Sequence, residues 1–126
     1  MQLHFALGTA EEKAFIDKFK TAFEAGDKAT LGSFLYTKGA RPREIKNMKT
    51  GLTHAAGEKI SKIELVDFNA DDAKELNEFL AKRGKQVSLK PTKILLYGCT
   101  SLVGVQWVDL ALKDGKFVIP VPVPVK

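Results

Sequence analysis

The chain has 126 residues, 44% hydrophobic and 28% charged, which is typical of one folded domain, and we predict a single domain over residues 1–126. A single cysteine, Cys99, excludes an intramolecular disulfide and a cysteine-rich metal site. No apolar run approaches the roughly 20 residues of a membrane span, and the N-terminus lacks the basic segment of a signal peptide. We expect no membrane, metal or cofactor. The sequence leaves the compartment open: as given, we expect a cytoplasmic protein, and an exported protein with its signal removed would look the same.

The net charge of +5 falls into alternating blocks. Residues 36–62 carry seven Lys or Arg and two Glu, residues 63–81 carry one Lys and six acids, and residues 82–93 carry five Lys or Arg. Alternating blocks are typical of solvated faces rather than of one continuous binding stripe. A nucleic-acid binder would need the two basic blocks side by side, so we do not expect a nucleic-acid partner.

Helical patterns fill the first half of the chain. Thr9 and Glu12 form a capping box, which predicts that the first helix begins there. Gly26 then predicts the end of that helix, and Asp27 predicts the N-cap of a short second one. The apolar residues between recur at helical spacing and predict a stripe that faces the core: Phe15, Ile16, Phe19, Ala22 and Phe23.

Two more helices are predicted further along. Pro42 suits the first turn of a third helix that stops near Gly57. Asn69 or Asp71 can cap a fourth, which Gly84 would end. Its apolar face consists of Ala73, Leu76, Phe79 and Leu80.

The strand patterns lie at residues 59–68, 92–99 and 102–112. In the first of these strands the alternation of apolar and polar residues breaks at Val66, which predicts a bulge or burial on both faces. Asp114-Gly115 predicts a two-residue hairpin. That turn would pair Leu112 with Phe117, Leu110 with Ile119, and Val108 with Val121.

The tail after Ile119 alternates proline and valine. Pro120 lacks the N–H that the hairpin register would direct at the partner strand. The ladder must therefore end near Ile119, or a bulge must turn the prolines outward. In both versions residues 120–125 stay extended, and we expect them to protect a sheet edge.

The stretch from Phe15 to Tyr36 combines an apolar-striped helix, Gly-Asp, and a short helix that ends in Leu-Tyr. It resembles the opening of nuclear-transport-factor-2-like (NTF2-like, or cystatin-like) domains. The resemblance implies an α+β fold with N-terminal helices packed on a curved antiparallel sheet that forms a cone. The family includes isomerases, dehydratases, ligand binders and dimerisation modules, so the fold alone transfers no activity. The Tyr and Asp pattern of its isomerases is not matched, and the helix over 70–83 departs from the commonest arrangement.

Asp109 is the one acid within the long apolar strand, and it shares a face with Trp107. If that face is covered, burial would raise the pKa of Asp109 and suit it to proton transfer. If that face meets solvent instead, Asp109 would be a surface carboxylate without a special role. Tyr36 and Tyr97 either donate hydroxyls to a pocket or fill the core. His54 is a further candidate for catalysis, but it lies off the apolar stripe of its helix, where a lone histidine is usually exposed or locally hydrogen-bonded.

We predict a small-ligand-binding or protein-interaction module rather than an enzyme. Its ligand would be small and apolar, and its site would involve Trp107, Asp109, Phe19 and Tyr36. An isomerase or dehydratase that uses Asp109 with a Tyr is one alternative, and a weak, non-specific nucleic-acid binder is another. We expect Cys99 to be a buried, inert thiol.

The long strand is apolar on both sides, with Val103, Val105 and Trp107 on one and Val108, Leu110 and Leu112 on the other. The helices of so small a domain can cover only one face of a curved sheet. The other face predicts a homodimer through the sheet, unless the helix over 70–83 covers it.

Overall fold

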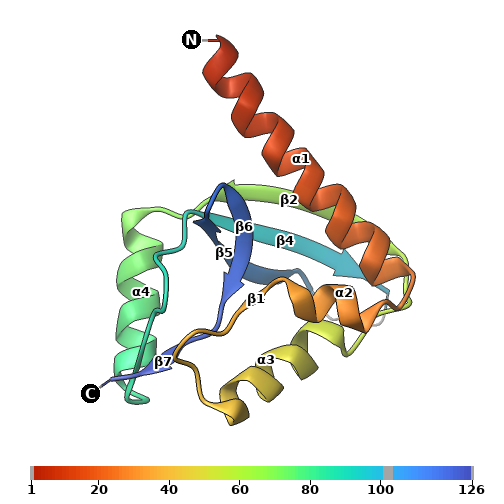
Figure 1. Cartoon of the computed structure of the whole chain (residues 1–126). Helices are drawn as coiled ribbons and strands as arrows, with labels where there is room; N and C mark the ends of the chain where they lie inside the picture. The colour runs from red at the N-terminus through yellow and green to blue at the C-terminus, as the bar shows by residue number, and fades with distance from the viewer. Residues whose placement is uncertain (1, 101–103, 126) are drawn as a thin grey trace.

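A computed structural model describes residues 2–100 and 104–125, with side chains from Ala10 onward. It confirms the α+β class (Figure 1). The helices are α1 (Gln2–Glu24), α2 (Lys28–Ser33), α3 (Pro42–Thr53) and α4 (Ala70–Ala81). The main sheet has the order β1-β6-β5-β4-β2, with β1 (Leu35–Tyr36), β6 (Lys116–Pro120), β5 (Gln106–Lys113), β4 (Lys93–Cys99) and β2 (Ile60–Asp67). A second, small sheet pairs β3 (Lys85–Gln86) with β7 (Val123–Pro124). Among the described residues, no helix is long and apolar enough to cross a membrane.

The local signals at helix ends act as predicted. The Asp27 carboxylate accepts hydrogen bonds from the Thr30 backbone N–H at 3.1 Å and the Thr30 hydroxyl at 2.6 Å, which caps α2. Asn69 and Asp72 form a reciprocal capping box at the start of α4, with both bonds at 2.9 Å. Gly26 ends α1 with a φ of +70°, a conformation that glycine adopts without strain.

The predicted start of the first helix is wrong. α1 begins at Gln2, so Thr9 lies within the helix and is not its N-cap. The preceding residues include Gln, Leu and Ala, which are strong helix formers, and they extend the helix through the capping sequence. As a result, the N-terminal end of α1 projects beyond the sheet (Figure 1).

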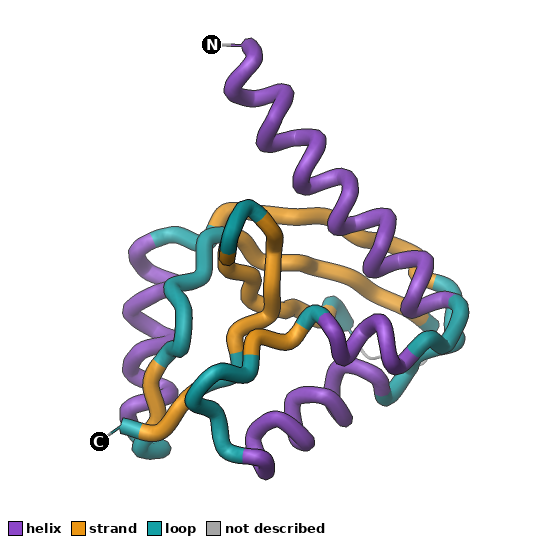
Figure 2. Tube along the Cα trace, viewed as in Figure 1, coloured by secondary structure: helices purple, strands orange, loops and turns teal. Residues whose placement is uncertain are grey.

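The core lies between one face of the main sheet and α1, α2 and α3. Phe19 and Phe23 of α1 are fully buried, so the predicted stripe is confirmed. They pack with Leu31 of α2 and with Leu95 and Leu110 of the sheet, all of which are also fully buried. α4 stands apart from these helices, at the opposite end of the sheet from α2 (Figure 2).

The turn between β5 and β6 is the predicted two-residue hairpin. Asp114 and Gly115 have φ values of +53° and +78°, as a type I′ turn requires, and Leu112 pairs with Phe117. The last pair of this ladder is Ala111 with Val118. The expected pairs beyond it do not form, and the ladder ends just before Ile119 because Pro120 has no N–H to donate to β5.

Residues 120–125 are expected to protect a sheet edge, but strand β6, which leads into them, is not an edge strand. The side of β6 away from β5 pairs with β1 in parallel, so the sheet is mixed rather than wholly antiparallel. The N–H of Ile119 donates to the Phe34 carbonyl at 2.8 Å, and that of Val121 to the Tyr36 carbonyl at 2.9 Å. The tail is extended as predicted, but it is paired again, with β3, and Val125 donates to the Gly84 carbonyl at 2.9 Å.

The irregularity in β2 lies between Ile60 and Lys62, not at Val66. Leu65 and Val66 are adjacent and both half-buried, which fits the alternative of burial on both faces. Leu65 packs against the main core, so Val66 points to the opposite face of the sheet.

We expect Phe19→Ala and Phe23→Ala each to lower the free energy of unfolding by about 3–5 kcal/mol, because each leaves a cavity in a close-packed core. Chemical denaturation measures the loss. Phe79→Ala, which truncates a ring that is 53% exposed, is the matched control and should cost less than about 1 kcal/mol. Equal losses in all three variants would mean that the α1 stripe is not the core.

Candidate functional site

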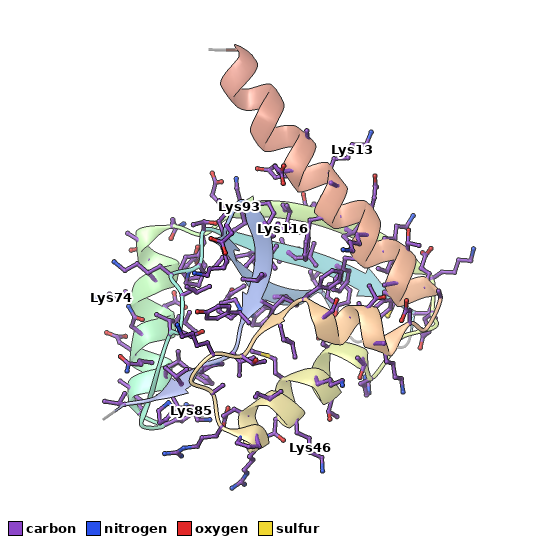
Figure 3. All side chains as sticks on the ribbon, in the orientation of Figure 1. Lys13, Lys46, Lys74, Lys85, Lys93 and Lys116 are labelled. Atoms are coloured by element: carbon purple, nitrogen blue, oxygen red, sulfur yellow. The ribbon has the colours of Figure 1, made fainter. Side chains whose placement is uncertain are left out.

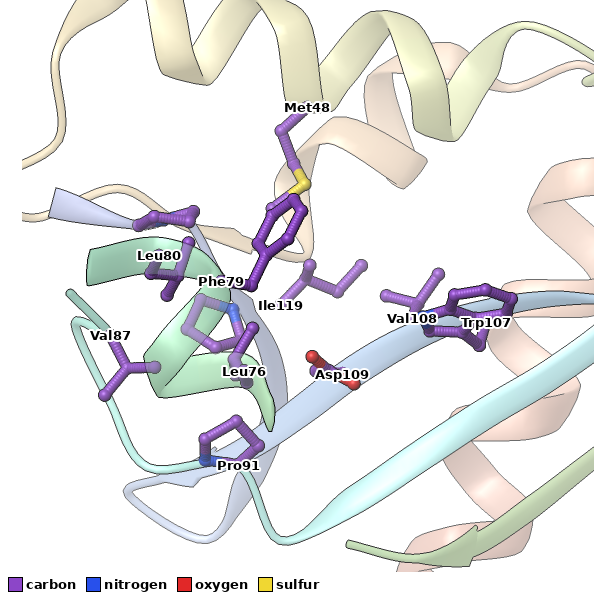
Figure 4. A pocket seen from close by; sticks show the side chains of 12 residues that line it. Met48, Leu76, Phe79, Leu80, Val87, Pro91, Trp107, Val108, Asp109 and Ile119 are labelled. Atoms are coloured by element: carbon purple, nitrogen blue, oxygen red, sulfur yellow. The ribbon is translucent and has the colours of Figure 1, made fainter. Parts of the chain in front are cut away.

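A cavity opens where β5 and β6 separate. It lies between the end of β6, the middle of β5 and helix α4, and its volume is about 250 Å³ (Figure 4). The walls are almost entirely apolar. They include Leu76, Phe79 and Leu80 of α4, Val108 and Asp109 of β5, and Pro120 and Pro122 of the tail.

The cavity passes through the gap between the two strands. Val108 and Asp109 are consecutive on β5, so their side chains point to opposite faces of the sheet, and both line the cavity. Met48 of α3 also lines it, from the side of the main core. A continuous ladder between β5 and β6 would close this opening.

A second cavity, of about 460 Å³, continues from the first between α4 and the sheet. The two cavities share Leu76, Phe79, Trp107 and Asp109, so Asp109 lies where they meet. The remaining walls of the second cavity are Phe68, Asp72, Glu75, Ile94 and Leu96. We call the two cavities together the α4 groove.

Among the described residues that line the first cavity of the α4 groove, only Asp109 has a charged side chain. It is half-buried, and its carboxylate has no hydrogen bond or ion pair with any described residue. Burial raises the pKa of Asp109, and the negative charge of Asp72 raises it further. In Figure 4 its carboxylate points from β5 toward the space beneath α4.

The charge in the α4 groove is of one sign. Its charged lining residues are Asp109, Asp72 and Glu75, and no Lys, Arg or His of the described part of the chain lines either cavity. Across the described part of the chain, no three His, Cys, Asp or Glu side chains are placed to hold a metal ion. The arrangement can therefore hold an apolar group and offer it a carboxylate.

Two aromatic residues stand at the opening of the groove. Trp107 is 70% exposed and Phe79 is 53% exposed. The guanidinium of Arg83 lies over the Phe79 ring, 3.7 Å from the ring centroid, and donates to the Phe79 carbonyl at 3.1 Å. One face of that ring is therefore occupied by a cation already, whereas the Trp107 indole has no ring or cation contact among the described residues.

Of the predicted site residues, the structure brings Asp109 and Trp107 together but not the others. Phe19 is fully buried in the core, 5.2 Å from Tyr97 between ring centroids. Tyr97 faces that core, on the side of the sheet opposite Asp109, and burial raises its pKa. Tyr36 is half-buried beside Pro120 and lines neither cavity.

The structure confirms the exposure or burial that the sequence predicted for two other residues. His54 is exposed, just after the end of α3, and Cys99 is a buried free thiol. The residues that the sequence reasoning missed are Leu76 and Phe79 as walls of a site, together with the tail prolines. The apolar face of the fourth helix was the signal for the first two, since such a face has to cover something.

The two basic blocks meet at one point. Lys85 of the second block forms a 2.6 Å ion pair with Glu44 in the first, and both side chains are largely buried. The labelled lysines are otherwise spread around the molecule, on α1, α3, α4 and several strands (Figure 3). Neither cavity of the α4 groove is lined by a residue of this contact.

No protein-family model matches this chain, and no curated protein or solved structure matches it either. The relationship to NTF2-like domains therefore stays a prediction.

Asp109→Asn should stabilise the fold at about pH 7. The folded protein raises the pKa of Asp109 above its unfolded value, so the native state binds more protons between the two values and loses stability as the pH rises through that window. Asn cannot ionise and removes this loss. Denaturation at several pH values should show that the variant is more stable than the parent at neutral pH and that this difference disappears in acid.

Asp114→Asn removes the same charge from the exposed hairpin turn, where Asn is favoured at positive φ, and serves as the control. It should not show the gain in stability at neutral pH that is expected of Asp109→Asn, because its side chain is exposed. An Asp109→Asn protein that is less stable than the parent at neutral pH would mean that the carboxylate makes a stabilising contact in the folded state.

Proposed function

We propose that this chain is a binding module that takes up a small, mainly apolar ligand in the α4 groove. The observation that carries the proposal is an apolar cavity of about 250 Å³ that contains one carboxylate without a partner among the described residues. Ligand sites are typically concave and apolar, with a few polar groups that fix orientation. Asp109 would be that polar group.

The position of α4 supports the same proposal. The helix does not fill the space between itself and the sheet. Leu80 of α4 is buried, whereas Phe79 of α4 and Trp107 of β5 stay largely exposed. The gap between β5 and β6 extends the groove toward Met48. An aromatic ring with a short chain is a suitable occupant in size and polarity.

Trp107 is the only tryptophan of the chain and lies in the groove, so its fluorescence reports binding directly. We expect the neutral probe 2-phenylethanol to cause a saturable change in this fluorescence. NMR shift changes should be confined to the residues that line the groove, on α4, β5, β4 and residues 119–122 and at Met48, Phe68, Val87 and Pro91.

Val87→Phe should abolish this binding, because Val87 lines the cavity from the loop after β3 and a larger side chain would fill it. Leu112→Phe makes a similar enlargement at a position that is 50% exposed and outside the groove, and it should bind as the parent does. A linear, non-saturating response, or equal binding by both variants, would contradict the proposed site.

A second candidate function is self-association through the same side of the sheet. Trp107, Phe79 and Val105 are each at least half exposed, at 70%, 53% and 50%. Single exposed apolar residues are common, but large ones close together favour an interface. Trp107 and Phe79 border the same groove, so a second copy would be seated over its opening. Val103, one of the strand residues from which a dimer is predicted, lies outside the described residues, and β5 begins only at Gln106.

For this candidate, sedimentation at micromolar concentration should give a mass of twice 13.9 kDa. Trp107→Glu should return the protein to a monomer while leaving it folded, because the side chain is mostly exposed. A parent protein that sediments as a monomer rules the dimer out and leaves the ligand proposal intact.

A further inference from the structure

We infer that the ligand of the α4 groove is a small organic cation, namely an aromatic or alkyl group that carries a protonated amine. This inference rests on the proposed function and names the chemical class of its ligand. The apolar group would occupy the cavity between β5 and β6, and the ammonium would lie beside Asp109 at the junction of the two cavities.

The charges of the groove favour a cation over a neutral or anionic ligand. Asp109, Asp72 and Glu75 line it, and no basic side chain of the described residues does. A carboxylate or phosphate group would enter a site of its own sign. An ammonium group instead supplies the partner that Asp109 lacks, in a setting where a charge-assisted hydrogen bond is stronger than in water.

Two carboxylates of α4, those of Asp72 and Glu75, favour a cation in the second cavity as well. Asp72 is close enough to Asp109 for its charge to act on that carboxyl group, although its own oxygen accepts a hydrogen bond from Asn69 at 2.9 Å. Glu75 is exposed, one helical turn further along the same face. Together they add negative charge to the entrance of the groove, in a chain whose net charge is +5, while the Arg83 guanidinium lies over the Phe79 ring at the same opening.

The aromatic residues are suited to the same ligand. A cation packs favourably over an aromatic face, and indole is the best of the side-chain rings for this contact. Arg83 already occupies the Phe79 ring in this way, at 3.7 Å, which shows that a ring at the groove can hold a cation. The Trp107 ring lines both cavities together with Asp109 and is 70% exposed, so it can receive one from the ligand.

A matched series of three ligands tests the inference: 2-phenylethylamine, 2-phenylethanol and phenylacetate. They share the ring and a short chain and differ chiefly in charge. Titrations followed by Trp107 fluorescence at near-neutral pH and low salt should give the amine a dissociation constant about tenfold lower than that of the alcohol, with phenylacetate weakest. NMR titration places the bound ligand independently of the fluorescence.

Asp109→Asn should reduce the preference for the amine over the alcohol to about twofold or less, because the charge-assisted bond is lost. Asp114→Asn loses the same charge outside the groove and should keep the full preference. Circular dichroism of both variants establishes that they are folded before the titrations are compared.

The outcomes separate the inference from the proposed function. If the alcohol binds as tightly as the amine, the groove is a ligand site without cation preference and the inference is overturned. The inference is also overturned if phenylacetate binds best, or if Asp109→Asn keeps the full preference for the amine. If none of the three ligands binds, the proposed function fails with it.

Discussion

The arrangement of the C-terminal half depends on one missing hydrogen-bond donor. In the register fixed by the Asp114-Gly115 turn, the backbone of residue 120 would pair with β5 opposite Asp109, but proline has no N–H. The β5–β6 ladder therefore stops at Ala111 and Val118. Beyond this point the two strands are free to separate, and the cavity beside Asp109 occupies the space that a regular sheet would have closed.

The alternation of valine and proline leaves the tail with backbone N–H donors on one side only. Residues two apart in an extended chain point their N–H groups the same way, so the prolines leave one side without donors and the valines keep the other. Val121 uses its N–H to hold β1, and Val125 uses its own to hold Gly84, just after α4. The same segment thus opens the groove, holds β1, and holds the chain at the end of helix α4, which lines the groove.

The features that the sequence predicted are those set by a few neighbouring residues. The cap at Asp27, the cap at Asn69, one of the two residues expected there, and the turn at Asp114-Gly115 each depend on residues within one or two turns of chain, and all three formed. Near the N-terminus a local signal failed at Thr9, because strong helix formers on its N-terminal side outweighed it.

The features that could not be predicted join segments far apart in the chain. The parallel pairing of β1 with β6 and the small β3–β7 sheet rest on backbone bonds, which leave no pattern in the side chains. For the site, the sequence identified Asp109 and Trp107 as neighbours on one strand face. What covers that face depends on where α4 packs, and neither the strand nor the helix pattern specifies this.

The same geometry is the reason for proposing ligand binding rather than proton-transfer catalysis. General acid–base chemistry on a carbonyl compound combines a base with a donor that stabilises the developing oxyanion, as a tyrosine hydroxyl does. Tyr97 lies on the opposite face of the sheet from Asp109, and Tyr36 lines neither cavity. The titratable groups that do line the groove, among the described residues, are all carboxylates. Carboxylates in an apolar site attract positive charge. A bound ammonium would offset the burial that raises the pKa of Asp109, so binding of a cationic ligand should stabilise the fold.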